Sequence, residues 1–238
     1  MSKIQSIILP KLGTIQLVIK TKRESRAHST GNHSNDESLE WFYWNKVWFS
    51  EVALAEWFIK NWHPDGLKGK HVLELGCGTG LAGLACAKLG ASVTFSDKVP
   101  VAMESVEENC HINGITGGQT LIVDWADPVG LSQIYDFIIG SEIFYDITFL
   151  PDICRLLERG LPKTGSGIFC DPNRLGLDKL EANFSKNFTL TLSSLRVQWP
   201  QGTPEKSEDK EVCLYEFQRN NLETAVGSPS NFFQIQIP

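Results

Sequence analysis

Apolar residues between positions 71 and 219 recur with two different spacings. Short apolar runs, as in 137–140, are typical of buried strands, whereas repeats every three or four residues, as in 81–89, are typical of amphipathic helices. The pattern predicts strands at 71–75, 92–96, 119–123, 136–142 and 166–170, helices at 81–89, 99–112, 147–159 and 176–184, and a short turn or helix near 127–132. Strands that alternate with helices through short connections favour a parallel sheet covered on both faces.

Two further strands complete the pattern. Residues 189–198 and 211–219 are separated by a polar loop, 200–210, which has no helical repeat. Consecutive strands without a helix between them pair antiparallel, so we expect a hairpin at the edge of the sheet. The predicted fold class is therefore α/β, with a Rossmann-like, mostly parallel seven-stranded sheet that ends in an antiparallel β-hairpin.

The N-terminal part of the chain precedes the alternating strands and helices. Runs 4–9 and 14–20 surround a turn at 10–13 and predict an N-terminal β-hairpin. Residues 21–39 are polar without a hydrophobic repeat, which predicts a mobile loop. An aromatic-rich segment then leads into an amphipathic helix predicted at 50–61. Its aromatic residues are Trp41, Phe42, Tyr43, Trp44, Trp48 and Phe49.

We expect a single structural domain, because domains split only beyond roughly 250–300 residues and this chain has 238. Within it, residues 1–40 form the N-terminal hairpin and mobile loop, 41–220 the sheet domain, and 221–238 a polar tail. Residues 232–237 of the tail would add a short edge strand.

Composition narrows the classes of function. The net charge of −6 and the pI of about 5.4 disfavour a broad nucleic-acid-binding surface. The six cysteines show no CxxC and no metal-ligand spacing, so we expect buried, reduced thiols and no metal site. No apolar run reaches the ~18 residues of a membrane span, and no signal peptide is visible. These features predict a cytoplasmic protein that binds neither nucleic acid nor membranes.

Residues 72–80, V-L-E-L-G-C-G-T-G, carry the most specific chemical signal. An apolar strand runs into glycines at alternate positions, and a helical pattern follows directly. Glycine permits a positive φ and lets a ligand approach the backbone without a Cβ in the way. The helix N-terminus beyond offers unpaired N–H groups. This arrangement predicts a loop that binds a nucleotide cofactor.

Two cofactors fit this loop. Residues 78–83 read G-x-G-x-x-G, with Asp97 ~20 positions further on, which is typical of dinucleotide-binding folds. However, Glu74 places a carboxylate where it would repel a pyrophosphate, and Gly76 extends the pattern to E-x-G-x-G-x-G. Asp97, at the end of the next strand, can accept hydrogen bonds from both ribose hydroxyls. The pattern resembles the S-adenosylmethionine site of class I (seven-stranded) methyltransferases, and the nicotinamide cofactor stays as the alternative.

Further motifs extend this resemblance. In chain order they are Tyr43-Trp44-x-x-x-Trp48, the glycine loop, Asp97, Asn109, Asp124-Trp125, Glu142-x-x-Tyr145 and Asp171-Pro172-Asn173-Arg174. Over roughly residues 41–220 the chain resembles the protein-lysine methyltransferase branch, and its electron-transfer-flavoprotein lysine methyltransferase-like members in particular. It departs from that subgroup at Phe49-Ser50, where the subgroup has small residues.

The resemblance implies a role for each motif. Glu142 and Tyr145 are the implied catalytic residues, which orient the acceptor amine and stack beside it. The implied cofactor-binding residues are Trp48, Glu74, Gly76, Cys77, Gly78, Gly80, Asp97, Lys98, Asp124, Trp125 and Ser141. Of these, Glu74 would face the methionine end of the cofactor, while Asp124 and Trp125 would hold the adenine. The implied substrate-binding residues are Trp44, Asp171, Asn173 and Arg174.

The function that follows is S-adenosylmethionine-dependent methylation of lysine in a protein substrate. A small-molecule N- or O-methyltransferase, a nicotinamide-dependent oxidoreductase and a cofactor-binding scaffold without catalysis are the alternatives. The strand at 136–142 does not lead into the [DN]-P-P-[YF] motif that is used on amide or adenine nitrogens, which further disfavours a nucleic-acid substrate.

Overall fold

The structure is a computed structural model that describes residues 2–21, 43–128, 130–131, 133–199 and 209–220. Most of the loop predicted at 21–39 and of the loop at 200–210 lies outside the described residues. The C-terminal tail, with its expected edge strand at 232–237, lies outside them as well. The division into the segments 1–40, 41–220 and 221–238 therefore stays a prediction.

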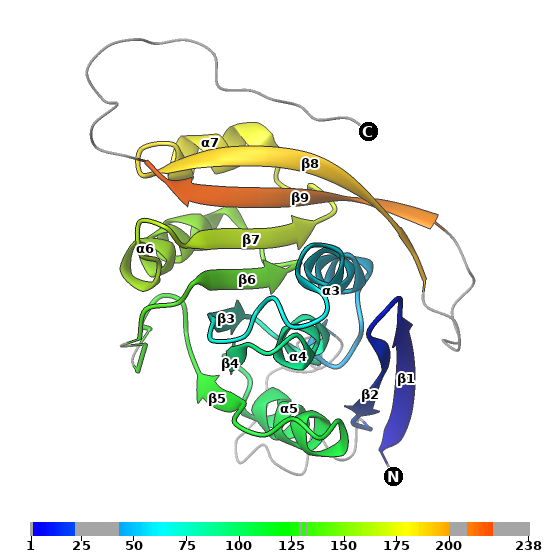
Figure 1. The fold of residues 1–238 in the computed structure, drawn as a ribbon. Helices are drawn as coiled ribbons and strands as arrows, with labels where there is room; N and C mark the ends of the chain where they lie inside the picture. Colours follow the sequence, from blue (N-terminus) through cyan, green and yellow to red (C-terminus); the bar gives the residue numbers. More distant parts are fainter. Residues whose placement is uncertain (1, 22–42, 129, 132, 200–208, 221–238) are drawn as a thin grey trace.

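A seven-stranded sheet forms the centre of the described chain (Figure 1). Its strands are β3 (His71–Leu75), β4 (Ser92–Asp97), β5 (Gln119–Ile122), β6 (Phe137–Ser141), β7 (Ser166–Asp171), β8 (Phe188–Gln198) and β9 (Asp209–Arg219). The order across the sheet is β5-β4-β3-β6-β7-β9-β8, and β9 runs antiparallel to both of its neighbours, while β3 to β7 pair parallel. The predicted mostly parallel sheet with a C-terminal antiparallel hairpin is confirmed.

Helices cover both faces of the sheet, as predicted (Figure 1). They are α3 (Phe49–Trp62), α4 (Leu81–Lys88), α5 (Pro100–Ile112), α6 (Leu150–Gly160) and α7 (Leu177–Phe184), with a 3₁₀ turn, η1 (Ile147–Phe149), before α6. One hydrophobic core joins α3, α4 and α5 to the sheet, and a second joins α6 and α7 to its other face. No helix among the described residues is long and apolar enough to cross a membrane.

The helix predicted at 147–159 begins as η1 because Asp146 holds the first turn. Its Oδ1 accepts hydrogen bonds from the N–H and the hydroxyl of Thr148, at 2.9 and 2.8 Å. A turn or short helix is predicted near 127–132, where residues 129 and 132 lie outside the described residues. Directly before it, an isolated bridge between Asp124 and Asp127 closes a turn.

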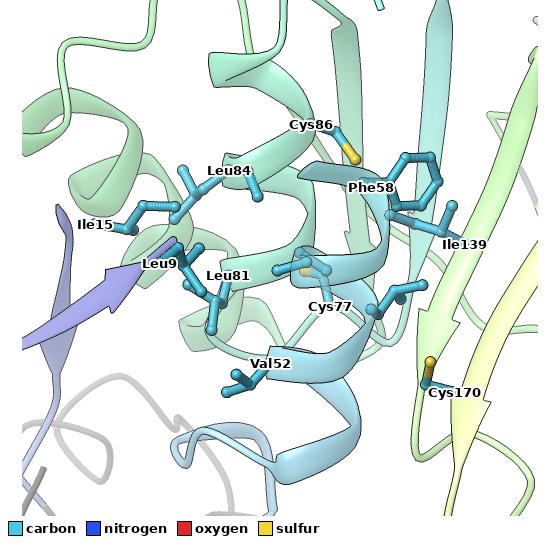
Figure 2. Packing of buried hydrophobic residues seen from close by; sticks show 14 of the residues in the cluster. Leu9, Ile15, Val52, Phe58, Cys77, Leu81, Leu84, Cys86, Ile139 and Cys170 are labelled. Atoms are coloured by element: carbon cyan, nitrogen blue, oxygen red, sulfur yellow. The ribbon is translucent and has the colours of Figure 1, made fainter. Parts of the chain in front are cut away.

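The N-terminal hairpin consists of β1 (Lys3–Leu9) and β2 (Gly13–Ile19), which pair antiparallel as predicted. It forms a separate two-stranded sheet that packs against the helices on one side of the molecule (Figure 1). Figure 2 shows Leu9 and Ile15 of this hairpin beside Leu81 and Leu84 of α4, and all four side chains are fully buried or nearly so. The hairpin is therefore part of the core that supports α4.

Asparagine side chains bind backbone groups along the free edge of β2 and at Lys20, the residue after it. Asn113 and Asn45 each accept from one backbone N–H and donate to the carbonyl of the same residue, Gln16 and Lys20 respectively. Between them, Asn109 Oδ1 accepts from the N–H of Val18 at 2.6 Å. A side-chain amide carries one acceptor and two donor hydrogens, so it can satisfy a strand edge much as another strand would.

Asn109 also donates from Nδ2 to the carbonyl oxygen of Thr79, at 3.0 Å, in the glycine loop. Asn109→Ala should destabilise the protein by about 2–4 kcal/mol, because it leaves a buried N–H and a buried C=O without their partner. Urea unfolding of the full chain measures this change. Asn61→Ala, which removes an exposed bond to Trp57 within α3, is the matched control and should cost about 0.5 kcal/mol or less. Equal costs for the two variants would contradict the role of Asn109.

Candidate active site

A cavity of about 940 Å³ lies where the carboxyl ends of β3, β4 and β6 meet the segment before α3. The sheet order reverses between β3 and β6, and open α/β sheets bind their ligands at such a point. Most of the predicted site residues line this cavity, namely Trp44, Trp48, Gly76, Cys77, Gly78, Asp97, Lys98, Asp124, Trp125, Ser141, Glu142, Tyr145 and Arg174. The predicted residues outside the lining are Glu74, Gly80, Asp171 and Asn173.

The glycine loop turns from β3 into α4 with a positive φ at Gly76, Gly78 and Gly80, of 57°, 51° and 77°. At Gly78 a Cβ would lie only 2.9 Å from the carbonyl oxygen of Trp44. The loop is thus packed against the backbone of the segment before α3. From the sequence we expect the missing Cβ of glycine to leave space for a ligand. At Gly78 the backbone of Trp44 fills this space instead.

Carboxylates of the protein itself bind the N–H groups of the loop and of the first turn of α4. The pairs are Asp97 Oδ2 with Gly78 N–H at 3.0 Å, Glu51 Oε1 with Leu81 N–H at 2.8 Å, and Glu74 Oε2 with Gly83 N–H at 3.0 Å. These are the donors that a phosphate group would need at a helix N-terminus. A pyrophosphate placed here would meet negative charge and donors that are already bound.

Glu74 lies behind the loop and not in the cavity lining. It is 1% exposed, and a Cβ on Gly83 would lie 2.4 Å from its Oε2 and 2.4 Å from the ring of Phe95. The glycine at 83 therefore lets α4 approach β3 and β4 closely, with the carboxyl group of Glu74 between them. Burial, with a further contribution from Glu51, raises the pKa of Glu74 well above its usual value.

Sequence reasoning misses Glu51, which lines the cavity from the first turn of α3 and is 3% exposed. Besides Leu81, it accepts a hydrogen bond from Thr79 Oγ1 at 2.9 Å. Burial raises its pKa to about 7, although these hydrogen bonds and one from the N–H of Trp48 act in the opposite direction. The spacing in the sequence does indicate that Glu51 is buried. It stands three positions before Leu54, on the face of the helix that the apolar residues identify as buried.

Asp97 is 7% exposed at the end of β4, and its Oδ1 accepts from the N–H of Val99 at 3.0 Å. Burial raises its pKa, while the surrounding N–H groups and Lys98 lower it. Both carboxylate oxygens keep a second lone pair for a ligand. Asp124 and Trp125 follow β5 on the same side of the cavity, where Asp124 Oδ1 accepts from the N–H of Ala126 at 2.9 Å.

Aromatic rings line two sides of the cavity. Trp125, Tyr145 and Phe149 contact one another, with ring centroids 5.4–6.4 Å apart. Elsewhere in the lining, Tyr43 stacks on Trp48 at 6.3 Å. Phe149 belongs to the lining but is absent from the sequence prediction, because nothing in the sequence shows that η1 turns back towards Trp125.

Glu142 follows β6 in the left-handed region, with φ of 58°, and its N–H donates to the carbonyl oxygen of Cys170 at 2.9 Å. A non-glycine residue in this conformation costs roughly 1–3 kcal/mol and is common at functional sites. The carboxylate is held at both oxygens: Oε1 accepts from Ser50 Oγ at 2.6 Å, and Oε2 forms an ion pair with Arg174 Nη2. The fold thus holds one carboxylate in a fixed orientation at the end of β6.

Arg174 connects Glu142 to Asp171, which lies outside the lining. Its N–H donates to Asp171 Oδ1 at 2.9 Å, and its Nη1 lies 3.6 Å from Oδ2. Burial raises the pKa of Asp171 to about 6 in spite of this cation. Asn173, at a φ of 65°, accepts a hydrogen bond from the hydroxyl of Tyr215 at 2.9 Å. Asp171 and Asn173 thus support Arg174 from outside the cavity.

Curated proteins of known activity resemble this chain. It is 34% identical over 148 residues to protein N-lysine methyltransferase METTL21A of Danio rerio, across 58% of this chain and 66% of the relative. It is 33% identical over 151 residues to histone-arginine methyltransferase METTL23 of Xenopus laevis, across 60% and 63%. It is 30% identical over 138 residues to the electron transfer flavoprotein beta subunit lysine methyltransferase of Xenopus laevis, across 56% and 53%. The chain spans less than two thirds of the length of these relatives.

Solved structures share the fold. One is the 16S rRNA N2 G1207 methyltransferase of T. thermophilus, solved in complex with AdoMet and guanosine. The match covers 92% of this chain and 51% of the chain of that methyltransferase, at 17% identity and a TM-score of 0.63. The ribosomal protein L11 methylase of Lactobacillus delbrueckii subsp. bulgaricus matches 70% and 78%, at 23% identity and a TM-score of 0.52. At this identity the likeness concerns the fold alone.

The family model described as lysine methyltransferase matches residues 36–190, which include the glycine loop, Asp97, Trp125 and Glu142. The match spans more than half of the chain, and the fold agrees with it. The protein therefore belongs to the lysine methyltransferase family.

Proposed function

We propose that the protein transfers a methyl group from S-adenosylmethionine to a lysine side chain of a protein substrate. Membership of a methyltransferase family implies this methyl donor. One observation carries the choice of cofactor: the N–H groups of Gly78, Leu81 and Gly83 are bound by carboxylates of the protein. A dinucleotide needs such groups for its pyrophosphate, whereas S-adenosylmethionine has no phosphate.

The charge of the lining fits the same cofactor. Its carboxylates are Glu51, Asp97, Asp124, Glu142 and Asp146, and its cations are Lys46, Lys98 and Arg174. Five acidic groups against three basic ones favour a cationic ligand over a polyphosphate. Bound S-adenosylmethionine would supply a methyl group that its sulfonium already activates. Asp97 is placed to accept from the ribose hydroxyls, and Trp125 beside Asp124 offers a ring face and an acceptor for the adenine.

The acceptor side of the cavity suits an amine. A lysine must be neutral to attack, and its pKa is ~10.4 in water, so a dry, aromatic-lined approach favours the neutral form. Tyr145 and Phe149, which are in ring contact, provide such surfaces. Glu142 is placed to accept a hydrogen bond from the amine and to direct its lone pair, while Ser50 and Arg174 keep the carboxylate in place. The protein's contribution is orientation and exclusion of water.

Arginine is the second candidate acceptor, because a relative of similar identity is named as a histone-arginine methyltransferase. We favour lysine because the family model is one of lysine methyltransferases and because Glu142 already binds the guanidinium of Arg174. A link to the electron-transfer-flavoprotein subgroup rests on Asp171-Pro172-Asn173-Arg174 and on the similarity to its Xenopus laevis member. A cytoplasmic location and the absence of nucleic-acid substrates also stay proposals.

Asp97→Ala should weaken the binding of S-adenosylhomocysteine by roughly 1.5–3 kcal/mol, the scale of lost charge-assisted hydrogen bonds. Isothermal titration calorimetry measures this change. Asp136→Ala is the matched control, because Asp136 also accepts a backbone N–H, that of His71, but lies at the other end of the strands and outside the cavity. Unchanged affinity in Asp97→Ala would contradict the assignment.

Glu142→Gln should lower the rate of methyl transfer by about tenfold or more, at least ~1.4 kcal/mol in the barrier, if the carboxylate orients the amine. Affinity for S-adenosylhomocysteine should change much less, and it serves as the internal control. The wild-type rate should rise towards pH 9 as a larger fraction of the acceptor lysine becomes neutral. A parallel loss of rate and cofactor affinity would instead place Glu142 at the cofactor.

Incubation of the full chain with radiolabelled S-adenosylmethionine and a cell extract tests the acceptor class. After acid hydrolysis of the labelled protein, the label should appear in methylated lysines. Label in methylarginine would establish the second candidate. Label confined to small molecules would end the proposal of a protein substrate and leave the cofactor assignment standing.

A further inference from the structure

We propose that Glu51 anchors the α-ammonium group of the cofactor's methionine part, a role that sequence reasoning places on Glu74. The inference rests on the proposed use of S-adenosylmethionine. Glu51 lies on α3, the helix before the glycine loop, and so outside the glycine motif.

The position of Glu51 is set from three directions. It stands in the first turn of α3, where the N–H of Trp48 contributes a hydrogen bond to its carboxylate. Thr79 Oγ1 and the N–H of Leu81 bind its Oε1, at 2.9 and 2.8 Å. The carboxylate therefore joins the first turns of α3 and α4 and borders the cavity beside Thr79. A cationic group bound in the cavity beside Thr79 would therefore lie next to this carboxylate.

The neighbouring carboxylates are engaged elsewhere. Glu74 faces α4 through Gly83 and is not part of the lining. Asp97 lies at the end of β4 with Lys98 beside it, on the side proposed for the ribose. Glu142 forms its ion pair with Arg174. Among the described residues, neither Glu51 nor Asp97 forms an ion pair with a lysine or arginine, but Lys98 lowers the pKa of Asp97, whereas no cation contributes to the pKa of Glu51.

The electrostatic environment favours a cationic ligand at this point. Two other carboxylates interact with Glu51 by like charge, Glu142 after β6 and Glu74 in β3. Burial is the main reason that the pKa of Glu51 is raised to about 7, and the charge of Glu142 adds to the shift. A group with a raised pKa loses its charge as the pH falls below that value, so an ammonium ligand should bind more weakly at pH 6 than at pH 8.

The test compares two ligands on the full chain by calorimetry. S-adenosylhomocysteine carries the α-ammonium group, and 5′-methylthioadenosine shares the adenosine part but lacks the amino acid. Glu51→Gln keeps an oxygen acceptor for Thr79 and Leu81 and removes only the charge. It should weaken S-adenosylhomocysteine about tenfold or more, with 5′-methylthioadenosine changed about twofold at most. Glu56→Gln, on the same helix and outside the lining, should change neither.

The pH dependence gives an independent reading. Between pH 8 and pH 6, the wild-type preference for S-adenosylhomocysteine over 5′-methylthioadenosine should fall about tenfold, as expected for a carboxylate of pKa about 7. In Glu51→Gln this preference should not depend on pH. Any change in the charge of Asp97 would affect the ribose contacts of both ligands and therefore cancels in the ratio.

Each outcome decides. Equal weakening of both ligands in Glu51→Gln would mean that Glu51 only supports the loop, and would overturn the inference. A selective loss in Glu74→Gln, with Glu51→Gln unaffected, would restore the role to Glu74. If the wild type binds neither ligand, the proposed function itself fails, which is a different result from normal wild-type binding with an unaffected Glu51→Gln.

Discussion

Three N–H groups, that of Gly78 in the glycine loop and those of Leu81 and Gly83 in the first turn of α4, are bound by carboxylates of three different elements, and the rest of the site depends on these bonds. Asp97 comes from β4, Glu51 from α3 and Glu74 from β3. A hydrogen bond to a charged group contributes about 1.5–3 kcal/mol, so the three together hold the loop against the sheet and both helices. The same bonds remove the feature by which a helix N-terminus binds phosphate. Stability of the loop and selectivity for a cationic nucleoside thus have one cause.

The N-terminal hairpin is linked to the same loop. Asn109 binds the N–H of Val18 in β2 and the carbonyl of Thr79 in the loop, so one buried side chain joins the two. Leu9 and Ile15 of the hairpin pack on α4 from the same side (Figure 2). The hairpin therefore supports α4 and the loop from behind the cavity.

At the other side of the cavity, the fold holds Glu142 in a conformation that an isolated chain would avoid. The N–H of Glu142 is bound by Cys170 of β7, and its carboxylate by Ser50 and Arg174. Three partners, from β7, from α3 and from the loop after β7, thus hold this residue with its left-handed backbone in place. A methyltransferase that mainly orients its reactants gains from such rigidity, because orientation is the contribution that the protein makes.

Much of the fold follows from local sequence pattern. Apolar runs such as 137–140 indicate burial directly, and the glycines of the loop indicate a positive φ, which the structure confirms at Gly76, Gly78 and Gly80. The space that we expect for a ligand at Gly78 is instead filled by the backbone of Trp44. The sequence does not show in which direction a side chain points when its partner lies far away along the chain. Glu74 matched a motif but turns towards Gly83, whereas Glu51 matched none and borders the cavity. The bonds of Asn109 and the ion pair of Arg174 with Glu142 likewise depend on segments that only the folded chain brings together.

We propose that this cavity binds a cationic nucleoside and excludes a dinucleotide. Parallel calorimetric titration of the full chain with S-adenosylhomocysteine and with NADH tests it most directly. Saturable one-to-one binding of S-adenosylhomocysteine, with no heat from NADH at the same concentrations, is the predicted result. Tight binding of NADH without a response to S-adenosylhomocysteine would contradict it. The pyrophosphate of NADH would then have to bind N–H groups that, in this account, accept no ligand because carboxylates of the protein already bind them.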